Sequence, residues 1–308
     1  MQIKNGKYRI RNYNITDYKN YARLYSIAAV ESKEEYLGIS PKQIQLRSEC
    51  SGNSFFQNLF LVEKNKEIIG SLFVVPERKI GRVILYCFIN PFHRRKKIGD
   101  NLFTIGLKHA RALSLSTAHV NVCKDNSTGI AFLDSLGFGY VRKYLEMEKS
   151  LVGAGEQVAD LPAGFYYRCL QSGEEKKLAY LQNHSFQDSW GFNPNTADDV
   201  KLWICKTCGS PEDIILAFSG EKPVGYCWTL IDRKKRIGKI YMIGVKPAYR
   251  GNNLGKALLA KGLNYLAKKG IHTAVLTVDN ENEPAKTLYN SVGFNVINTT
   301  LWFEKKIG

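Results

Sequence analysis

The sequence lacks any segment that could cross a membrane as a helix. No apolar run approaches the roughly 18 residues that a bilayer-spanning helix needs. The first residues, MQIKNGKYRIRNYNITDYKN, are polar and contain no apolar signal core. We therefore expect a cytoplasmic protein with no membrane partner.

Acidic residues are scarce relative to basic ones. There are 28 Asp and Glu against 44 Lys and Arg, and the net charge is +16. Such a balance favours anionic partners. The cations are dispersed along the chain, apart from the runs at 94–97 and 233–236. Nucleic acid is therefore a less favoured partner than a small anion.

The cysteines lack the pattern of a metal site. Cys205 and Cys208 form the one CxxC pair, and no second CxxC or His pair follows at a suitable spacing. The seven cysteines are odd in number and widely spaced. This predicts reduced thiols and no bound metal.

The sequence repeats itself at a fixed spacing. Residues that define turns recur 156 positions apart: Pro91 and Pro247, Arg94 and Arg250, Gly99 and Gly255, Asn126 and Asn282, and Gly137 and Gly293. A gap-free repeat predicts a tandem duplication of one fold. We expect domains at 1–150 and 164–308, joined by a Gly-containing linker at 151–163.

The most informative stretch is 240–294. An apolar strand at 240–243 leads into a basic, Gly-containing turn at 250–256. Leucines then recur at helical spacing until Gly270, and a second strand follows at 273–278. The first amides of such a helix have no internal partner, and the helix dipole adds positive charge there. The turn is either an ordinary strand-to-helix connection or a phosphate site.

A second motif follows this turn and decides between these alternatives. Asn282, Ala285, Tyr289 and Gly293-Phe294 complete a pattern that resembles the GCN5-related N-acetyltransferase family. The usual loop in that family is Gln/Arg-x-x-Gly-x-Gly/Ala. Here Asn253 stands where Gly is usual, a mild departure because Asn tolerates left-handed backbone.

The resemblance implies a fold, a cofactor and site residues. Each copy should be a mixed α/β unit, a twisted and mostly antiparallel sheet with helices on both faces. The run at 301–305 should close the sheet of the second copy. Acetyl-CoA should be held by the strand, the loop and the second motif: Ile243, Gly244, Val245, Arg250, Gly251, Asn252, Asn253, Leu254, Gly255, Lys256, Asn282 and Ala285. Tyr289 should act as the general acid on the departing thiolate.

The first copy departs from the pattern at two positions. Lys97 replaces the loop residue, and Lys is poorly suited to positive φ. Leu133 stands where the second copy has Tyr289, and it has no proton to donate. We therefore expect the second copy to be catalytic and the first to be degenerate.

The acceptor side is less well defined. The tandem members that this layout resembles carry Glu on the strand before the loop, in a Gly-Glu-x-Tyr context, where this sequence has Lys239, a poor base unless buried. Asp188, His184 and Asp279 are the alternatives. Phe186, Trp190 and Phe192, between the first two helices of the second copy, could line the acceptor pocket or fill the core.

Together these patterns predict an N-acetyltransferase that moves acetyl directly from acetyl-CoA to a primary amine of a small molecule or peptide. The alternative is a CoA-binding or nucleic-acid-binding protein on the same fold, without catalysis. The sequence defines neither the acceptor nor the oligomeric state.

Overall fold

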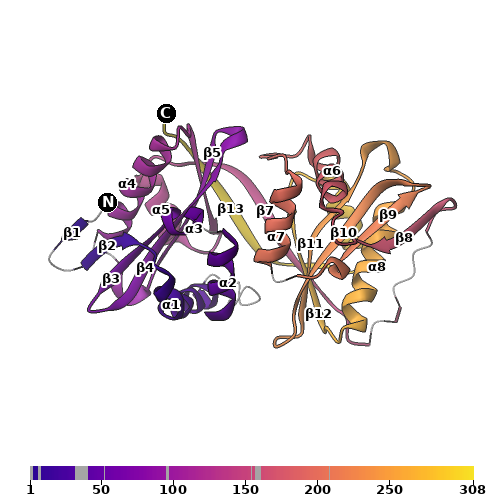
Figure 1. Ribbon diagram of the computed structural model, residues 1–308, viewed down its shortest axis with the longest axis horizontal. Helices are drawn as coiled ribbons and strands as arrows, with labels where there is room; N and C mark the ends of the chain where they lie inside the picture. Colours follow the sequence, from indigo (N-terminus) through magenta and orange to yellow (C-terminus); the bar gives the residue numbers. More distant parts are fainter. Residues whose placement is uncertain are drawn as a thin grey trace. The chain divides into compact units, whose positions relative to one another are not determined.

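The computed structural model describes residues 3–5, 8–31, 41–51, 53–94, 97–153, 155–156, 161–207 and 209–308. The chain forms two compact units, Met1–Lys143 with Thr300–Gly308, and Tyr144–Thr299. Each unit is a mixed sheet with helices packed against it (Figure 1). This confirms the predicted mixed α/β architecture.

The first unit contains a sheet in the order β1-β2-β3-β4-β5-β6-β13. Its pairs are antiparallel except for β5 with β6. The strands are β1 (Ile3–Asn5), β2 (Tyr8–Asn12), β3 (Leu59–Lys64), β4 (Glu67–Glu77), β5 (Arg82–Ile89), β6 (Thr117–Cys123) and the end of β13 (Asn295–Lys306). The helices are α1 (Tyr18–Glu31), α2 (Pro41–Ser51), α3 (Asn53–Asn58), α4 (Ile98–Ala112) and α5 (Ser127–Ser135).

The second unit repeats this plan in the order β7-β12-β11-β10-β9-β8. Only β11 and β12 are parallel. The strands are β7 (Gly139–Ser150, from Tyr144 on), β8 (Phe165–Cys169), β9 (Ile214–Ser219), β10 (Lys222–Asp232), β11 (Ile237–Val245) and β12 (Thr273–Asp279). The helices are α6 (Glu175–Phe186), α7 (Ala197–Lys206), α8 (Leu254–Lys268) and α9 (Glu283–Ser291).

The last strand of each chain half lies in the other unit. Residues 144–150 of β7 pair with β12, and residues 300–306 of β13 pair with β6. In Figure 1 the yellow end of β13 belongs to the violet unit. The prediction that 301–305 closes the second sheet is therefore wrong. Because the two halves are copies, β6 and β12 occupy equivalent places beside the parallel strands β5 and β11.

Two apolar layers hold the second unit together. On one face, α8 and α9 pack on the sheet through a core that includes Leu258, Leu263 and Ile240. On the other face, α6 and α7 cover a core that includes Leu178, Phe218 and Trp228. A sheet with both faces buried is rigid, and this positions its strand ends and loops.

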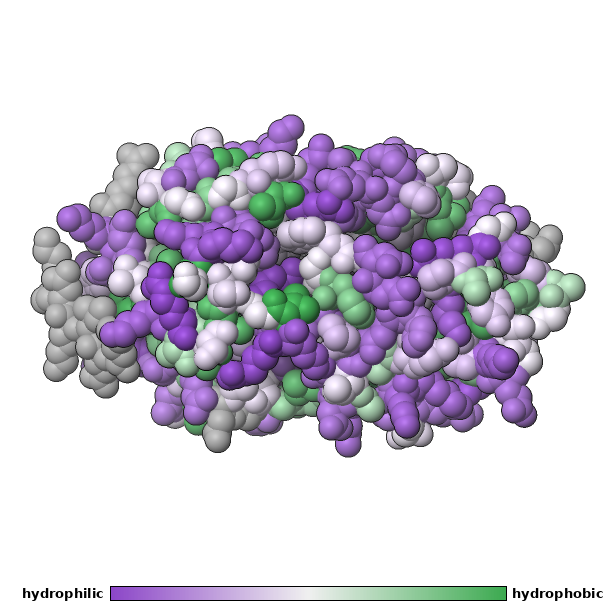
Figure 2. Space-filling model, turned by 90° about the horizontal axis from the view of Figure 1, so that it is seen from above, coloured by the Kyte–Doolittle hydropathy of each residue, from purple (hydrophilic) through white to green (hydrophobic). Residues whose placement is uncertain are grey.

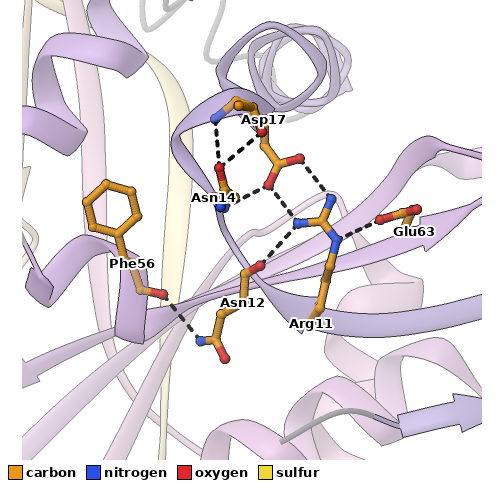
Figure 3. A network of polar contacts seen from close by, with 7 residues as sticks. Arg11, Asn12, Asn14, Asp17, Phe56 and Glu63 are labelled. Carbon is orange, nitrogen blue, oxygen red and sulfur yellow. Dashed lines mark hydrogen bonds and ion pairs between the residues drawn. The ribbon is translucent and has the colours of Figure 1, made fainter.

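A polar network fixes the start of the first unit (Figure 3). The Arg11 guanidinium donates to both carboxylate oxygens of Asp17, at 2.6 and 2.8 Å, and to Glu63 at 2.6 Å. Asp17 also accepts from the amide of Asn14 at 2.8 Å. One arginine thus ties β2 to β3 and to the helix entrance by charge-assisted, partly bidentate bonds.

The second unit contains the counterpart of this pair. Arg168 donates to both oxygens of Glu174 at 2.6 and 2.8 Å, and Glu174 accepts from the amide of Gln171 at 3.1 Å. The arginine and the carboxylate are again six positions apart, between a first strand and a first helix. The duplication therefore extends to the first strands, well beyond the motifs that revealed it.

The cysteines differ in part from the prediction. Cys87, Cys123, Cys169 and Cys227 are free thiols. Cys50 and Cys205 are disulfide-bonded, so the expectation of reduced thiols throughout is wrong for these two. Cys208, the other half of the CxxC pair, lies outside the described residues.

On the face seen in Figure 2, hydrophilic side chains predominate and hydrophobic ones are scattered. Among the described residues, no helix combines the length and the apolar character needed to span a membrane.

Candidate active site

The second sheet opens between its two parallel strands. The ladder between β11 and β12 ends at Ile240 and Leu276, although β11 continues to Val245 and β12 to Asp279. Beyond that point the described part of β11 pairs with β10 only. Backbone groups on the other edge of β11 are thus available to a ligand, because sheet pairing does not use them.

A β-bulge marks the beginning of this opening. Trp228 of β10 pairs with Met242, while the next residue, Thr229, pairs with Ile240. Tyr241 is therefore the extra residue on β11. A bulge bends its strand and increases the local twist, and bulges are common beside active sites.

The turn after β11 has the backbone of an anion-binding loop. Gly251 has φ +82°, and a Cβ added there would meet no atom within 4 Å, so its surroundings are open. Asn253 precedes α8 in left-handed conformation, with φ 58°, and no side chain caps the helix. The amides of Leu254 to Lys256 therefore remain for an anion at the positive end of α8.

Arg250 is placed to shape this loop. Its Nε donates to the Val245 carbonyl at 3.0 Å, and its Nη2 donates to the Ser185 carbonyl at 2.8 Å. The side chain thus joins the loop to the end of β11 and to α6.

Gly244 is required by close packing. A Cβ there would lie 2.8 Å from the Ser185 Cβ and 2.9 Å from the Tyr226 Cε1. The space beside this part of β11 is therefore filled by α6 and by a ring from β10. The adjacent Ile243 and Val245 pack toward the core under α8.

Tyr289 lies in α9 on the α8 side of the sheet. Its ring packs edge-on against Phe294, with centroids 6.0 Å apart, and the residue is 7 % exposed. Burial raises the pKa of its hydroxyl above the usual 10.0, so the group remains protonated at neutral pH. A protonated tyrosine is suited to donate a proton to a leaving thiolate.

The second motif also stabilises α9. Asn282 caps the helix, and its Oδ1 accepts from the amide of Ala285 at 3.1 Å. The resemblance to the family implies that both residues contact the cofactor. Their bonds in the structure form the helix cap that holds Tyr289 in place.

The α6–α7 loop is held firmly against α6. Asn195 exchanges hydrogen bonds with Asn183 at 2.8 and 2.9 Å and donates to Gln182 at 2.9 Å. The Trp190 ring of this loop lies near the Tyr144 ring of β7, with ring centroids 6.3 Å apart. The structure therefore brings this loop beside β7, which the sequence did not predict.

The other pocket candidates occupy different environments. Phe186 packs against the core under α6, and Phe192 is half-buried. Asp188 is exposed, and no hydrogen bond or ion pair among the described residues involves it. The Trp190 ring packs near a ring of β7.

The proposed bases are not equally placed. His184 donates from Nδ1 to the Tyr180 carbonyl at 2.8 Å, and its ring packs on Tyr180 with centroids 4.0 Å apart. Lys239 is half-buried on β11, and Asp279 ends β12 opposite Tyr144. A buried carboxylate that sequence reasoning missed, Glu146, lies on β7 and is 6 % exposed.

The first unit keeps the turn, and its parallel strands also part beyond Ile84 and His119, but it lacks the bulge and the tyrosine. Lys97 has φ 57°, like Asn253 in the second copy. Arg94 Nε donates to the Ile89 carbonyl at 3.2 Å, as Arg250 Nε does to the Val245 carbonyl. The expectation that Lys97 would disturb the turn is therefore wrong. Arg95 and Lys96 lie outside the described residues.

Two structural differences separate the copies. The β4–β5 register runs from Gly70 to Glu77 without a shift, so the first sheet has no counterpart of the bulge at Tyr241. Leu133, at the position of Tyr289, is a buried core residue. Only the second copy combines the loop with a bulge and a tyrosine.

Comparison with known proteins agrees with this geometry. A model of the Acetyltransferase (GNAT) family matches residues 21–138 and again residues 176–294. The two matches together cover more than half of the sequence. The chain therefore belongs to the acetyltransferase (GNAT) family, with one family fold in each half.

Relatives of known name are mycothiol acetyltransferases. That of Streptomyces scabiei (strain 87.22) is 33% identical over 179 residues, which cover 56% of each chain. That of Stackebrandtia nassauensis is 29% identical over 235 residues, covering 74% of this chain and 76% of the relative. The match spans 56% of the length of the Streptomyces scabiei protein and 47% of that of the Streptomyces bingchenggensis protein.

Solved structures show the same tandem fold. A GCN5-related N-acetyltransferase from Sphaerobacter thermophilus superposes with a TM-score of 0.77 at 21% identity, over 99% of this chain and 97% of that one. A tandem GNAT protein from the clavulanic acid biosynthesis pathway gives 0.75 at 13% identity, over 98% and 99%. The layout also resembles mycothiol synthase, as the tandem motifs predict.

Proposed function

We propose that the second unit transfers acetyl from acetyl-CoA to a primary amine of a small-molecule acceptor. The observation that carries this proposal is the combination, in that unit alone, of the open β11–β12 edge, the bulge at Tyr241 and the buried Tyr289. The first unit has the loop but lacks the bulge and the tyrosine.

The residues present fit the donor that the family implies. Acetyl-CoA supplies a thioester, whose carbonyl carbon accepts the amine and whose sulfur is the leaving group. The open amides at the start of α8 and the space beside Gly251 suit a pyrophosphate. Amides on the edge of β11 that does not pair with β12 can donate to the thioester carbonyl oxygen as negative charge develops on it.

The reaction needs a proton donor for the leaving sulfur, and Tyr289 is the proposed donor. The C–N bond forms and the C–S bond breaks, while the acceptor ammonium loses two protons. One proton passes to a base and then to solvent. Tyr289 donates a proton to the sulfur and recovers the other from the acceptor nitrogen through solvent.

The relatives' name suggests one acceptor to test among others. The panel should contain amino sugars, polyamines, aromatic-ring alkylamines, a peptide amino terminus and the amine that acetylation would convert into mycothiol. Lys239, at the position where tandem members carry Glu, weakens the case for that last amine.

The test is thiol release from acetyl-CoA in the presence of each amine, with the acetylated product identified by mass. We expect one chemical class to be acetylated. CoA binding without product from any amine, together with RNA binding that weakens steeply with salt, would instead support a non-catalytic binding protein.

A further inference from the structure

Strand β7 places a buried carboxylate beside the opening in the second sheet. Glu146 is 6 % exposed and lies opposite Thr277 of β12. Thr277 is the first β12 residue beyond the last β11 pair, Ile240 with Leu276, and it is exposed. Because neighbouring strands lie about 4.8 Å apart, the Glu146 backbone is roughly 10 Å from the line of β11. A glutamate side chain and one water molecule can bridge the remaining distance to an acceptor in the opening.

Glu146 points to the side of the sheet that carries the α6–α7 loop. Its neighbours Leu145 and Met147 belong to the core on the α8 side. Side chains alternate along a strand, so Glu146 shares the opposite face with Tyr144. Tyr144 contacts Trp190 of the α6–α7 loop, with ring centroids 6.3 Å apart. The carboxylate therefore lies on the same face as the aromatic side chain expected to bound the acceptor.

The carboxylate is oriented by a neighbouring amide. Asn298 Nδ2 donates to its Oε2 at 3.2 Å. Burying a carboxylate is costly, and Glu146 is the one acidic side chain that is buried among the described residues of the second unit, which points to a function.

Glu146 lies on the same face of the sheet as Lys239, which stands where a glutamate is expected from the resemblance. Ile240 belongs to the core on the α8 side, so Lys239 faces the α6–α7 side, as Glu146 does. Tandem members of the family carry Glu at the position of Lys239. In this chain a carboxylate lies on the same face, displaced across the sheet from β11 to β7.

We propose that Glu146 is the general base that accepts the ammonium proton of the acceptor, an inference that rests on the function proposed above. Glu146 takes one proton from the ammonium, directly or through one water, and leaves a neutral amine. The nitrogen lone pair forms the C–N bond, and the C–S electrons leave with the sulfur, which receives a proton from Tyr289; the second nitrogen proton returns to Tyr289 through solvent. Glu146 then releases its proton to solvent. The N-terminal half of the chain thus contributes a catalytic residue to the second unit.

Other titratable groups share this face of the second sheet. They are Lys239 and Tyr241 on β11, Asp279 on β12, and Tyr144 and Glu148 on β7, with His184 and Asp188 near the end of α6. The pH dependence alone would therefore not identify the base, and a substitution is needed.

The experiment compares Glu146→Gln with Glu148→Gln. Glu148 lies two residues further along β7 on the same face and is exposed, so it is a matched control. For a primary alkylamine acetylated by the wild type, we expect Glu146→Gln to lower kcat/KM at pH 7 by about 100-fold or more. Glu148→Gln should stay within about twofold of wild type, as expected for a group with no part in proton transfer.

The pH profile separates a base from a structural group. The loss in Glu146→Gln should shrink as the pH approaches the acceptor pKa of about 10, because the amine is then already neutral. The Kd for CoA should be unchanged. An equal loss at every pH, weaker CoA binding, or full activity in Glu146→Gln would overturn the assignment. Absence of wild-type turnover with any amine would instead remove the proposed function itself.

Discussion

Tyr226 of β10 lies directly opposite Gly244 of β11, and its Cε1 is 2.9 Å from the point that a Gly244 Cβ would occupy. The ring crosses the strand at the edge of the opening, with Ser185 of α6 on the same side. In the first unit the corresponding pair is Ser71 of β4 and Phe88 of β5, so the large and small residues are exchanged between strands. The second copy has been repacked where its site lies.

This contact predicts the cost of adding one methyl group to β11. Gly244→Ala should destabilise the second unit by about 1–3 kcal/mol, because the new Cβ overlaps two buried side chains. Gly255→Ala is the control, since its Cβ would meet Leu288 Cδ2 at an ordinary 3.8 Å. Chemical denaturation measures both, and equal stability of the two variants would contradict the packing argument.

The left-handed residue before α8 should control CoA affinity. Asn253→Val places a β-branched side chain at φ 58°, which costs about 1–2 kcal/mol and should weaken CoA binding roughly tenfold. Lys97→Val changes the equivalent position of the first unit, at φ 57°. Calorimetric titration of both variants should show a higher Kd for CoA in Asn253→Val. The Kd for CoA in Lys97→Val should equal that of the wild type. The opposite result would place the working site in the first unit.

The buried state of Tyr289 predicts the alkaline side of the activity profile. Burial raises the pKa of its hydroxyl above 10.0. The group is protonated below that pKa, so the acid remains available as the pH rises from 7 to 10. We expect no fall in kcat over this range from Tyr289. A decline near pH 8 that Tyr289→Phe abolishes would show that the hydroxyl titrates in the neutral range.

The Arg168–Glu174 pair should make the second unit sensitive to acid. Hydrogen bonds from Arg168 lower the pKa of Glu174 from 4.5 to about 2. A carboxyl with a lowered pKa stabilises the fold above its unfolded pKa, and this contribution is lost as the pH falls toward the folded value. The stability difference between wild type and Glu174→Gln should therefore be full above pH 4.5 and vanish near pH 2.

Thermal melting across that range measures the effect. Glu221→Gln, in the exposed turn between β9 and β10, supplies the comparison. A difference that persists unchanged at pH 2 would rule out the ion pair as its cause.

Much of the site could be predicted from the sequence because it depends on local backbone chemistry. Asn253 and Gly251 are residue types that accept positive φ, and both adopt it. Tyr289 was proposed from the resemblance of the second motif to that of the family. Lys97 was misjudged, because the surrounding turn imposes left-handed backbone on a residue that does not favour it.

The rest depends on pairing between distant segments. The exchange of 144–150 and 300–306 could not be predicted, since the two halves offer equivalent edges and similar strands. Glu146 lies within the predicted first domain, 1–150, so the sequence offers no reason to include it in the site of the second. The bulge at Tyr241 was also hidden, because it is a property of register and not of composition.

The most direct test of the account is amine-dependent thiol release by wild type and Tyr289→Phe at pH 7, with CoA affinity measured in both. If the second unit is the catalyst, the substitution should lower kcat by about 100-fold or more and leave the Kd for CoA within about twofold. Equal kcat in the two proteins would contradict the assignment of the chemistry to Tyr289 and the second unit.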